Sequence, residues 1–222
     1  MESKVQFLLF IALLVCIPVA KGWGIDGHLI ICRIYQPRLC EAAADAVSRL
    51  LPTYTGGDLG SVCSWVDHIK FQYHWSSALH YIDTPDDLCT YQYNRDCKDE
   101  EGIQDRCVAG AIKSYTSQLL SYRDLNAAYN LTEALLFLSH FMGDIHQPLH
   151  VRFTSDRVAN TIDVHWYTRK QVLHHVNFLN RSPPIVSPPT SFSFPSIKVG
   201  TVVFLHLLQV LAIRIGGLNP DR

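Results

Sequence analysis

The chain has 222 residues, enough for one sizeable domain but not clearly for two. Its formal net charge at pH 7 is −1, which excludes a nucleic-acid-binding protein that relies on a basic lysine–arginine surface. If the protein handles phosphate groups, the positive charge must come from elsewhere, and bound metal ions are the obvious candidate.

The first 22 residues have the pattern of a secretory signal peptide. Lys4 gives a positive start, the apolar run 7–15 is too short for a membrane span, and Ala20 and Gly22 are small residues three and one positions before a cleavage site. An uncleaved anchor is the alternative. Cleavage would remove two lysines and one glutamate, moving the formal charge from −1 to −2, and would make Trp23 the mature N-terminus. We therefore expect a secreted or endomembrane-lumen protein without stable membrane association.

Cysteine usage fits the same compartment. Cysteines remaining after the signal segment form an even set, which in a secreted chain indicates disulfides. Metal ligation is the alternative, although the sequence has no Cys-x-x-Cys pair. Asn130 begins an Asn-Leu-Thr glycosylation acceptor, which also favours secretion. The remaining cysteines are Cys32, Cys40, Cys63, Cys89, Cys97 and Cys107.

Four segments in the middle of the chain have the apolar spacing of α-helices. Strong helix formers such as alanine and leucine are frequent in them. Pro52 closes the first segment, Thr132 is the expected cap of the last, and Pro148 lies just beyond its end. The predicted helices are residues 40–51, 59–72, 107–122 and 131–145.

Other segments are less regular. Residues 83–106 are polar and cysteine-bearing, so we expect a loop there. Residues 160–168 alternate and are β-branched, which predicts a short strand, and residues 169–176 are expected to start a helix. Residues 177–222 are first rich in proline and serine and then apolar, so we expect a divergent tail that is disordered or non-native.

The most apolar predicted helix carries an unusual set of titratable groups. In LSHFMGDIHQPLH (138–150), His140 and Asp144 are four residues apart and share one helix face, as metal ligands often do. His150 follows a proline, where the chain can turn back. A single histidine on an apolar helix is more often a hydrogen-bonded core residue, but several such groups would each need a buried partner. This segment therefore favours a metal site.

Four other stretches repeat the combination of apolar residues with histidine and aspartate. They are WGIDGH (23–28), SWVDH (64–68), ALHYID (78–83) and VLHHV (172–176). A free α-amine at Trp23 could chelate a metal together with its own carbonyl oxygen. The further candidates in these stretches are His28, Asp67, His80, Asp83, His174 and His175.

Five motifs occur in a fixed order from Trp23 to Val176: WGxxGH, SWxD, LHxID, HFxGDxxQPLH, and NxIxV followed by LH. Together they resemble the secreted zinc-dependent single-strand nucleases of plants and fungi. The resemblance implies a mainly α fold over residues 23–176, a helical bundle of the zinc nuclease and phospholipase C type with a short β-hairpin. It also implies three zinc ions in one cleft and hydrolysis of single-stranded DNA and RNA to 5′-phosphate products, with 3′-nucleotidase activity. We expect a monomer.

The resemblance assigns zinc ligands motif by motif, with Asp144 bridging two ions. Imidazole and carboxylate groups are suitable zinc ligands. The implied sets are Asp67, His80, His140 and Asp144 for one ion; the amine and carbonyl of Trp23 with His28 and Asp144 for a second; and His150 with His174 for a third.

Further roles follow from the same motifs. Asp67 and Lys70 are implied to be catalytic, with Lys70 stabilising transition-state charge, and a surface lysine is the alternative. Tyr81 and Asp83 match positions that stack on and hydrogen-bond an unpaired base, with core packing as the alternative for Tyr81. Asn160 is expected to bind substrate. The resemblance gives no metal role to His68, His146 and His175. It supports the disulfides Cys32–Cys63 and Cys97–Cys107, and leaves Cys40 and Cys89 without assigned partners.

The chain departs from the family pattern after Val176. Asn177 and Phe178 stand where the family has tryptophan and a zinc-binding aspartate. Phenylalanine cannot bind a metal, so the third site is incomplete and activity is expected to be reduced. The family's C-terminal helices have no counterpart, and a frame change or retained intron would explain this break. A catalytically inactive homologue and a zinc phospholipase C-like hydrolase are the alternatives.

Overall fold

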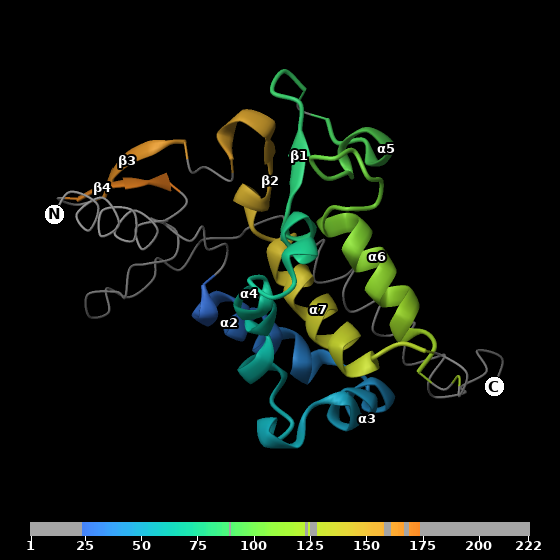
Figure 1. Ribbon diagram of the computed structural model, residues 1–222. Coiled ribbons are helices and arrows are strands. Elements are labelled where there is room, and N and C mark those ends of the chain that lie inside the picture. The colour runs from blue at the N-terminus through green and yellow to red at the C-terminus, as the bar shows by residue number, and fades with distance from the viewer. Residues whose placement is uncertain are drawn as a thin grey trace, which may run out of the picture.

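The computed structural model describes residues 24–88, 90–122, 124, 128–157, 161–166 and 169–173. Helices predominate in these segments, so the prediction of a mainly α fold is confirmed (Figure 1). Within the described residues, every helix is too short or too polar to cross a membrane. The expected tail after Val176 lies outside the described residues.

Helix α7 (Leu131–Asp144) is the central element. Its residues from Ala134 to Asp144 are all buried, and it lies among α2 (Ile25–Tyr35), α3 (Glu41–Leu50), α4 (Trp65–Ile69) and α6 (Val108–Leu119) (Figure 1). Burial of this helix on all sides explains why it is the most apolar of the predicted helices.

The start of α7 corrects one prediction. Asn130, and not Thr132, is the N-cap: its Oδ1 accepts a hydrogen bond from the backbone N–H of Glu133 at 3.1 Å. The Thr132 hydroxyl instead donates to the carbonyl oxygen of Leu50 at 2.7 Å, which ties the first turn of α7 to the end of α3. The predicted glycosylation acceptor thus lies at an exposed helix start.

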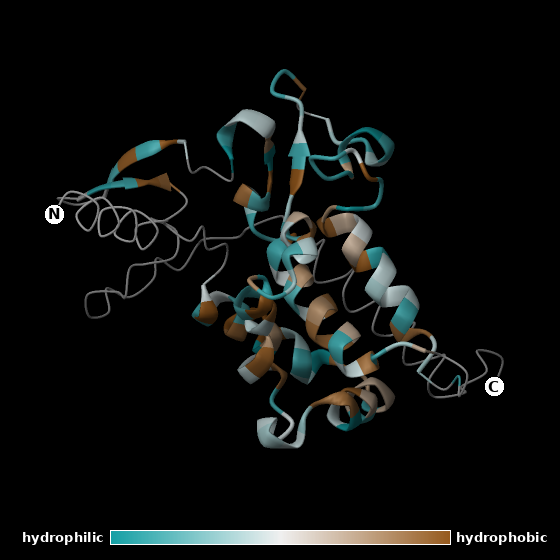
Figure 2. Cartoon of the chain, in the orientation of Figure 1, coloured by the Kyte–Doolittle hydropathy of each residue, from teal (hydrophilic) through white to brown (hydrophobic). Residues whose placement is uncertain are grey.

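Aromatic packing holds α6 against α7. The ring of Tyr115 stacks on Phe137, with centroids 4.8 Å apart, and Phe137 in turn stacks on Phe141. Both phenylalanines are fully buried. Burying each side chain stabilises the folded state by roughly 1.5–3 kcal/mol relative to leaving it exposed. In Figure 2, hydrophobic residues lie along α7, whereas the connection around α5 (Tyr93–Asp96) is mostly hydrophilic.

The predicted helix 59–72 is wrong as a continuous element. It is a 3₁₀ turn, η3 (Leu59–Val62), followed by the short helix α4. Ser64, with φ −88° and ψ 0°, separates them. Val66 and Ile69 are nevertheless buried, as their spacing predicts. The break redirects the chain so that α4 contacts α7.

Two small sheets complete the architecture. Strand β1 (Ile82–Thr84) pairs in parallel with β2 (Val151–Phe153), with Asp83 opposite Arg152. Strands β3 (Asp163–Trp166) and β4 (Arg169–Val172) form an antiparallel hairpin. The predicted hairpin is confirmed, but the helix expected to start at residue 169 is wrong, because residues 169–172 pair with β3. The other 3₁₀ elements are η1 (Gln36–Arg38), η2 (Thr53–Thr55), η4 (His74–His80), η5 (Pro148–His150) and η6 (Thr154–Asp156).

Both expected disulfides are present. Cys32–Cys63 joins α2 to the turn before α4, and Cys97–Cys107 closes the polar connection onto the start of α6. Cys40 is an exposed free thiol, and Cys89 lies outside the described residues. The first disulfide therefore links two of the segments that carry predicted metal ligands.

Candidate metal centre

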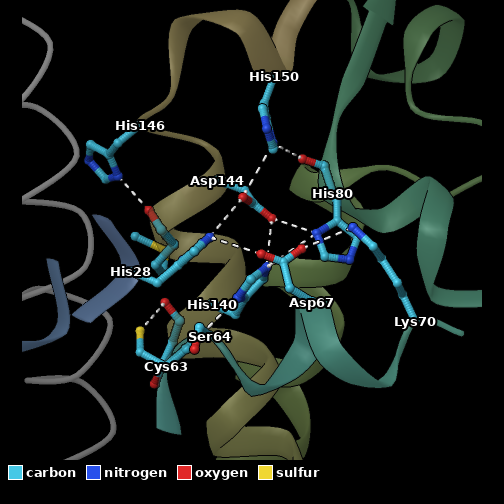
Figure 3. Close-up of polar contacts among 12 residues, drawn as sticks. His28, Cys63, Ser64, Asp67, Lys70, His80, His140, Asp144, His146 and His150 are labelled. Carbon is cyan, nitrogen blue, oxygen red and sulfur yellow. Dashed lines mark hydrogen bonds and ion pairs between the residues drawn. The ribbon is translucent and has the colours of Figure 1, made fainter. Parts of the chain in front are cut away.

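Six predicted ligands converge on one point, at the end of α7 (Figure 3). Helix α7 itself contributes two of them on one face, four residues apart. The others come from α2, from α4 and from the last residues of η4 and η5. The structure thus brings together His28, Asp67, His80, His140, Asp144 and His150.

Asp144 is the hub of this cluster. Its Oδ2 atom lies 2.8 Å from His80 Nδ1 and 3.2 Å from His140 Nε2. Its Oδ1 atom lies 3.3 Å from His150 Nδ1 and 3.5 Å from His28 Nε2. One carboxylate therefore faces four imidazole rings, and its two oxygen atoms face different pairs of them.

Backbone carbonyl groups orient two of these rings. His140 Nδ1 donates to the carbonyl oxygen of Cys63 at 2.8 Å, which directs its Nε2 atom toward Asp144. His150 Nδ1 donates to the carbonyl oxygen of His80 at 2.7 Å. Such contacts fix the tautomer and orientation of histidines that bind metals.

Gly143 allows α2 to approach α7. The rings of His28 and His140 stack with centroids 3.8 Å apart. A Cβ atom at Gly143 would lie 2.7 Å from His28 Nδ1, closer than van der Waals contact permits. Because His28 is fully buried and has nowhere to move, this position requires glycine.

Burial and mutual attraction set the charges of the cluster. Burial lowers the pKa of His28 to about 3, so this ring is neutral. Burial also opposes the ionised form of Asp144, but His140, His150 and His80 outweigh it and hold the pKa of Asp144 well below its usual value. Burial opposes a charged His140 too, yet the charge of Asp144 and the hydrogen bond to it raise the pKa of His140. A positive charge at this point is therefore favourable.

The residues present fit a metal ion better than a purely structural network. Several buried atoms have no hydrogen-bond partner among the described residues, and a buried polar atom without a partner is costly. Two groups of three have their ligand atoms within 4.8 Å of one another: His28, His140 and Asp144, and Asp67, His80 and His140. The atoms without hydrogen-bond partners include His28 Nδ1 and Nε2, His80 Nε2 and Asp144 Oδ1.

A family model described as S1/P1 Nuclease matches residues 23–177. The chain belongs to the S1/P1 nuclease family. Endonuclease 2 of Arabidopsis thaliana is 62% identical to it over 175 residues, covering 78% of this chain and 60% of that relative. Nuclease P1 of Penicillium citrinum is 35% identical over 133 residues, covering 58% and 47%. Nuclease S1 of Aspergillus oryzae is 32% identical over 160 residues, covering 70% and 53%. The chain thus spans three fifths or less of the length of these relatives.

Most of the remaining predicted residues of this S1/P1 nuclease chain fall into three groups. Lys70 lies beside the cluster, with Nζ 3.2 Å from Asp67 Oδ1. His146 points away from it, toward the Met142 carbonyl oxygen, and His68 is exposed. Trp23, Asn160 and His174 lie outside the described residues, together with His175, Asn177 and Phe178.

Two further predicted residues lie next to the cluster: Tyr81, just before β1, and Asp83, within it. They follow His80 by one and three residues, and both are half-buried. Arg152, on the paired strand β2, contacts both of them: its guanidinium carbon lies 5.1 Å from the centre of the Tyr81 ring, and its Nη2 lies 3.0 Å from Asp83 Oδ1. No sequence motif indicated Arg152. Its role follows from its pairing opposite Asp83, and that pairing has no local sequence signal.

Proposed function

We propose that this chain is a secreted zinc-dependent endonuclease that hydrolyses single-stranded DNA and RNA to 5′-phosphate products, with 3′-nucleotidase activity. The observation that carries the proposal is the buried cluster around Asp144, whose four imidazoles and second carboxylate, Asp67, come from four of the five motifs. Membership of the S1/P1 nuclease family supports the reaction class. The names of its relatives, endonucleases and nucleases, support a nucleic-acid substrate.

The described ligands would form one of the proposed zinc sites and part of a second. Asp67, His80, His140 and Asp144 would hold one ion, and His28 with Asp144 would contribute to the other. A zinc pair supplies a nucleophile at neutral pH and stabilises the attacking and leaving oxygens of an in-line displacement. Trp23 would complete the second site with its amine and carbonyl, and His150 with His174 would hold a third ion.

The protein side chains have separate tasks in this proposal. Asp144 joins the two sites because its oxygen atoms face different histidines. Lys70 is mostly buried beside Asp67, where its ammonium would stabilise charge that develops on the phosphate. Tyr81 offers a ring for an unpaired base, and such stacking favours single strands over duplexes. Asp83 would accept hydrogen bonds from that base.

The proposal is tested by expressing the full chain through a secretory route and measuring zinc per chain by mass spectrometry. Denatured DNA, duplex DNA, RNA, a 3′-mononucleotide and phosphatidylcholine are then assayed in parallel. We expect zinc in the purified protein, preference for denatured DNA over duplex, and N-terminal sequencing that begins at Trp23. Reduced turnover is expected because Phe178 replaces a ligand of the third site.

A matched pair of variants separates catalysis by this centre from a contaminating nuclease. His140→Ala removes a buried ligand, whereas His74→Ala removes an exposed histidine at the start of η4. We expect zinc content and cleavage to fall only in His140→Ala. Zinc-free wild-type protein, or equal cleavage by both variants, would contradict the proposal, and cleavage of phosphatidylcholine alone would replace it with a phospholipase.

A further inference from the structure

Arg152 is a buried cation that the proposed reaction does not use. Its side chain is only 7% exposed, although arginine is seldom buried without a defined role. It lies on β2 in register with Asp83 of β1. Strand β2 begins directly after His150, and β1 begins two residues after His80, so both strands continue from the predicted metal ligands.

The guanidinium of Arg152 has contacts on several sides. Its Nη2 lies 3.0 Å from Asp83 Oδ1, and its Nη1 lies 3.3 Å from Asp156 Oδ1. Nη1 also donates to the carbonyl oxygen of Phe153 at 3.1 Å. The guanidinium lies over the ring of Tyr81, with 5.1 Å to the ring centre, a favourable cation–π geometry. Arg152 is therefore held in place from more than one element.

This arrangement determines what Asp83 presents to a ligand. The Asp83 side chain is 30% exposed, but its Oδ1 atom is buried on the Arg152 side. The exposed part therefore belongs to its other atoms. Arg152 is itself too buried to stack on a base, so it supports Tyr81 and Asp83 from behind.

The distance from the metal centre suits a nucleotide. Asp83 is three residues beyond His80 along an extended segment, which spans about 10 Å at roughly 3.3 Å per residue. A phosphate at the metal centre and a base at Tyr81 and Asp83 are then separated by the length of a nucleotide. An ionised carboxylate at that place accepts hydrogen bonds and donates none.

We propose that Arg152 is a positioning residue that selects the base: it holds Tyr81 and an ionised Asp83 so that this pocket prefers guanine to adenine. This inference rests on the proposed nuclease function. Guanine presents two adjacent donors, N1–H and the N2 amino group, on the edge that would meet Asp83. Adenine presents one donor beside the N1 acceptor, which an ionised carboxylate repels. A neutral carboxyl group would reverse this preference, because it donates one hydrogen bond and accepts another.

The charges around Asp83 define how the selection depends on pH. Burial raises the pKa of Asp83 to about 6, Arg152 opposes this rise, and Asp156 and Glu100 add to it. Tyr81, just before the same strand, is the neighbouring titratable group, and burial raises its pKa above the usual value, so it is neutral here. Removing Arg152 would raise the pKa of Asp83 further.

The test is calorimetric titration of the full zinc-loaded chain with dGMP and with dAMP, from pH 5 to pH 8. At pH 8 we expect wild-type protein to bind dGMP about tenfold more tightly than dAMP, as one well-placed set of base contacts provides. This ratio should fall toward one, or reverse, as the pH falls below about 6. In Arg152→Gln, the preference for dGMP over dAMP at pH 8 should drop several-fold. The pH at which this preference is half lost, the pH midpoint, should move upward.

Three further variants separate positioning from general damage. Arg152→Lys keeps the charge and should restore the pH midpoint, but only part of the ratio, because it lacks the planar guanidinium. Arg33→Gln breaks a surface pair of the same kind, with Asp58 at 2.8 Å, and should change neither quantity. Asp83→Asn should make the ratio independent of pH, and it provides the same test if Arg152→Gln is poorly secreted.

Each result is decisive. An unchanged ratio and midpoint in Arg152→Gln, or a pH-dependent ratio in Asp83→Asn, overturns the role of Arg152. Wild-type protein that cleaves denatured DNA but binds both nucleotides equally at pH 8 overturns this inference alone. Wild-type protein that neither cleaves nor binds nucleotides overturns the proposed function and the inference with it.

Discussion

His140 Nε2 lies 3.2 Å from Asp144 Oδ2, one helical turn further along α7. Both side chains are buried, and the second nitrogen of His140 is already engaged by the Cys63 carbonyl oxygen. The geometry therefore directs the basic nitrogen of the ring and the carboxylate at the same point. An ordinary helix core would bury neither group, because each needs a polar or charged partner.

Asp144→Asn should empty the proposed zinc pair. The amide is nearly the same size as the carboxylate, but it is neutral and is a poor ligand where four histidines converge. We expect zinc per chain to fall and cleavage of denatured DNA to drop by at least about 100-fold, since loss of even an indirect metal contact costs 10–100-fold. Asp45→Asn, at an exposed position on α3, is the control for an equal change of charge. Normal zinc content in Asp144→Asn would contradict the hub role of Asp144.

Gly143→Ala should disturb the site without removing a ligand. The new methyl group would lie 2.7 Å from His28 Nδ1, so α2 and its histidine must move away from α7. Alanine stabilises helices relative to glycine by roughly 1 kcal/mol, so intrinsic helix propensity would predict the opposite effect on stability. We expect weaker zinc retention in competition with a chelator, together with a lower melting temperature. A more stable variant with unchanged zinc retention would show that His28 has room to move.

The sequence predicted those parts of the fold that local patterns determine. Helix α7 follows from apolar residues and a terminal proline, and its paired His140 and Asp144 follow from spacing alone. The continuous helix expected over residues 59–72 is wrong because the break at Ser64 depends on how the segment packs against α2 and α7. Strands β1 and β2 were not predicted, since three residues are too few to show a period and their partners are far apart in sequence.

Contacts that are made by backbone groups could not be predicted from the sequence either. Nothing in the residue types at position 63 or 80 indicates that their carbonyl oxygens orient His140 and His150. Arg152 reads as an ordinary surface arginine until the parallel pairing places it opposite Asp83. The ligand types were therefore predictable from sequence, whereas the groups that hold those ligands in position required the three-dimensional structure.

The disulfide Cys32–Cys63 should contribute to both stability and metal binding. It closes a loop with a sequence separation of 31 and lies immediately before the segment that carries Asp67. Replacing both cysteines by alanine should reduce the free energy of unfolding by about 3–4 kcal/mol, measured by urea denaturation. Zinc retention should weaken as well, because the Cys63 carbonyl oxygen orients His140. Cys40→Ala removes the exposed free thiol and should leave both measurements unchanged.

Asp83 should make the protein less stable as the pH rises through the acidic range. Its folded pKa of about 6 lies above the ordinary aspartate pKa of 3.8, so the unfolded chain loses this proton first. Between pH 3.8 and about 6 the folded state therefore binds more protons, and the Asp83 contribution to stability falls as the pH rises. Melting temperatures of wild-type and Asp83→Asn protein should diverge across this range, with the variant gaining relative stability toward pH 6. Parallel curves would contradict the raised pKa, and Asp45→Asn controls for loss of an exposed carboxylate.

Phe178→Asp should repair the third zinc site if the departure after Val176 is what weakens it. Phe178 is four residues after His174, where the resemblance to the family implies a zinc-binding aspartate. We expect the substitution to add about one zinc ion per chain and to raise the rate of cleavage of denatured DNA, since a carboxylate is a zinc ligand and phenylalanine is not. Phe178→Leu, which removes the ring without adding a ligand, is the matched control. If Phe178→Asp binds no more zinc than Phe178→Leu, a missing ligand at this position is not what limits zinc binding by this chain.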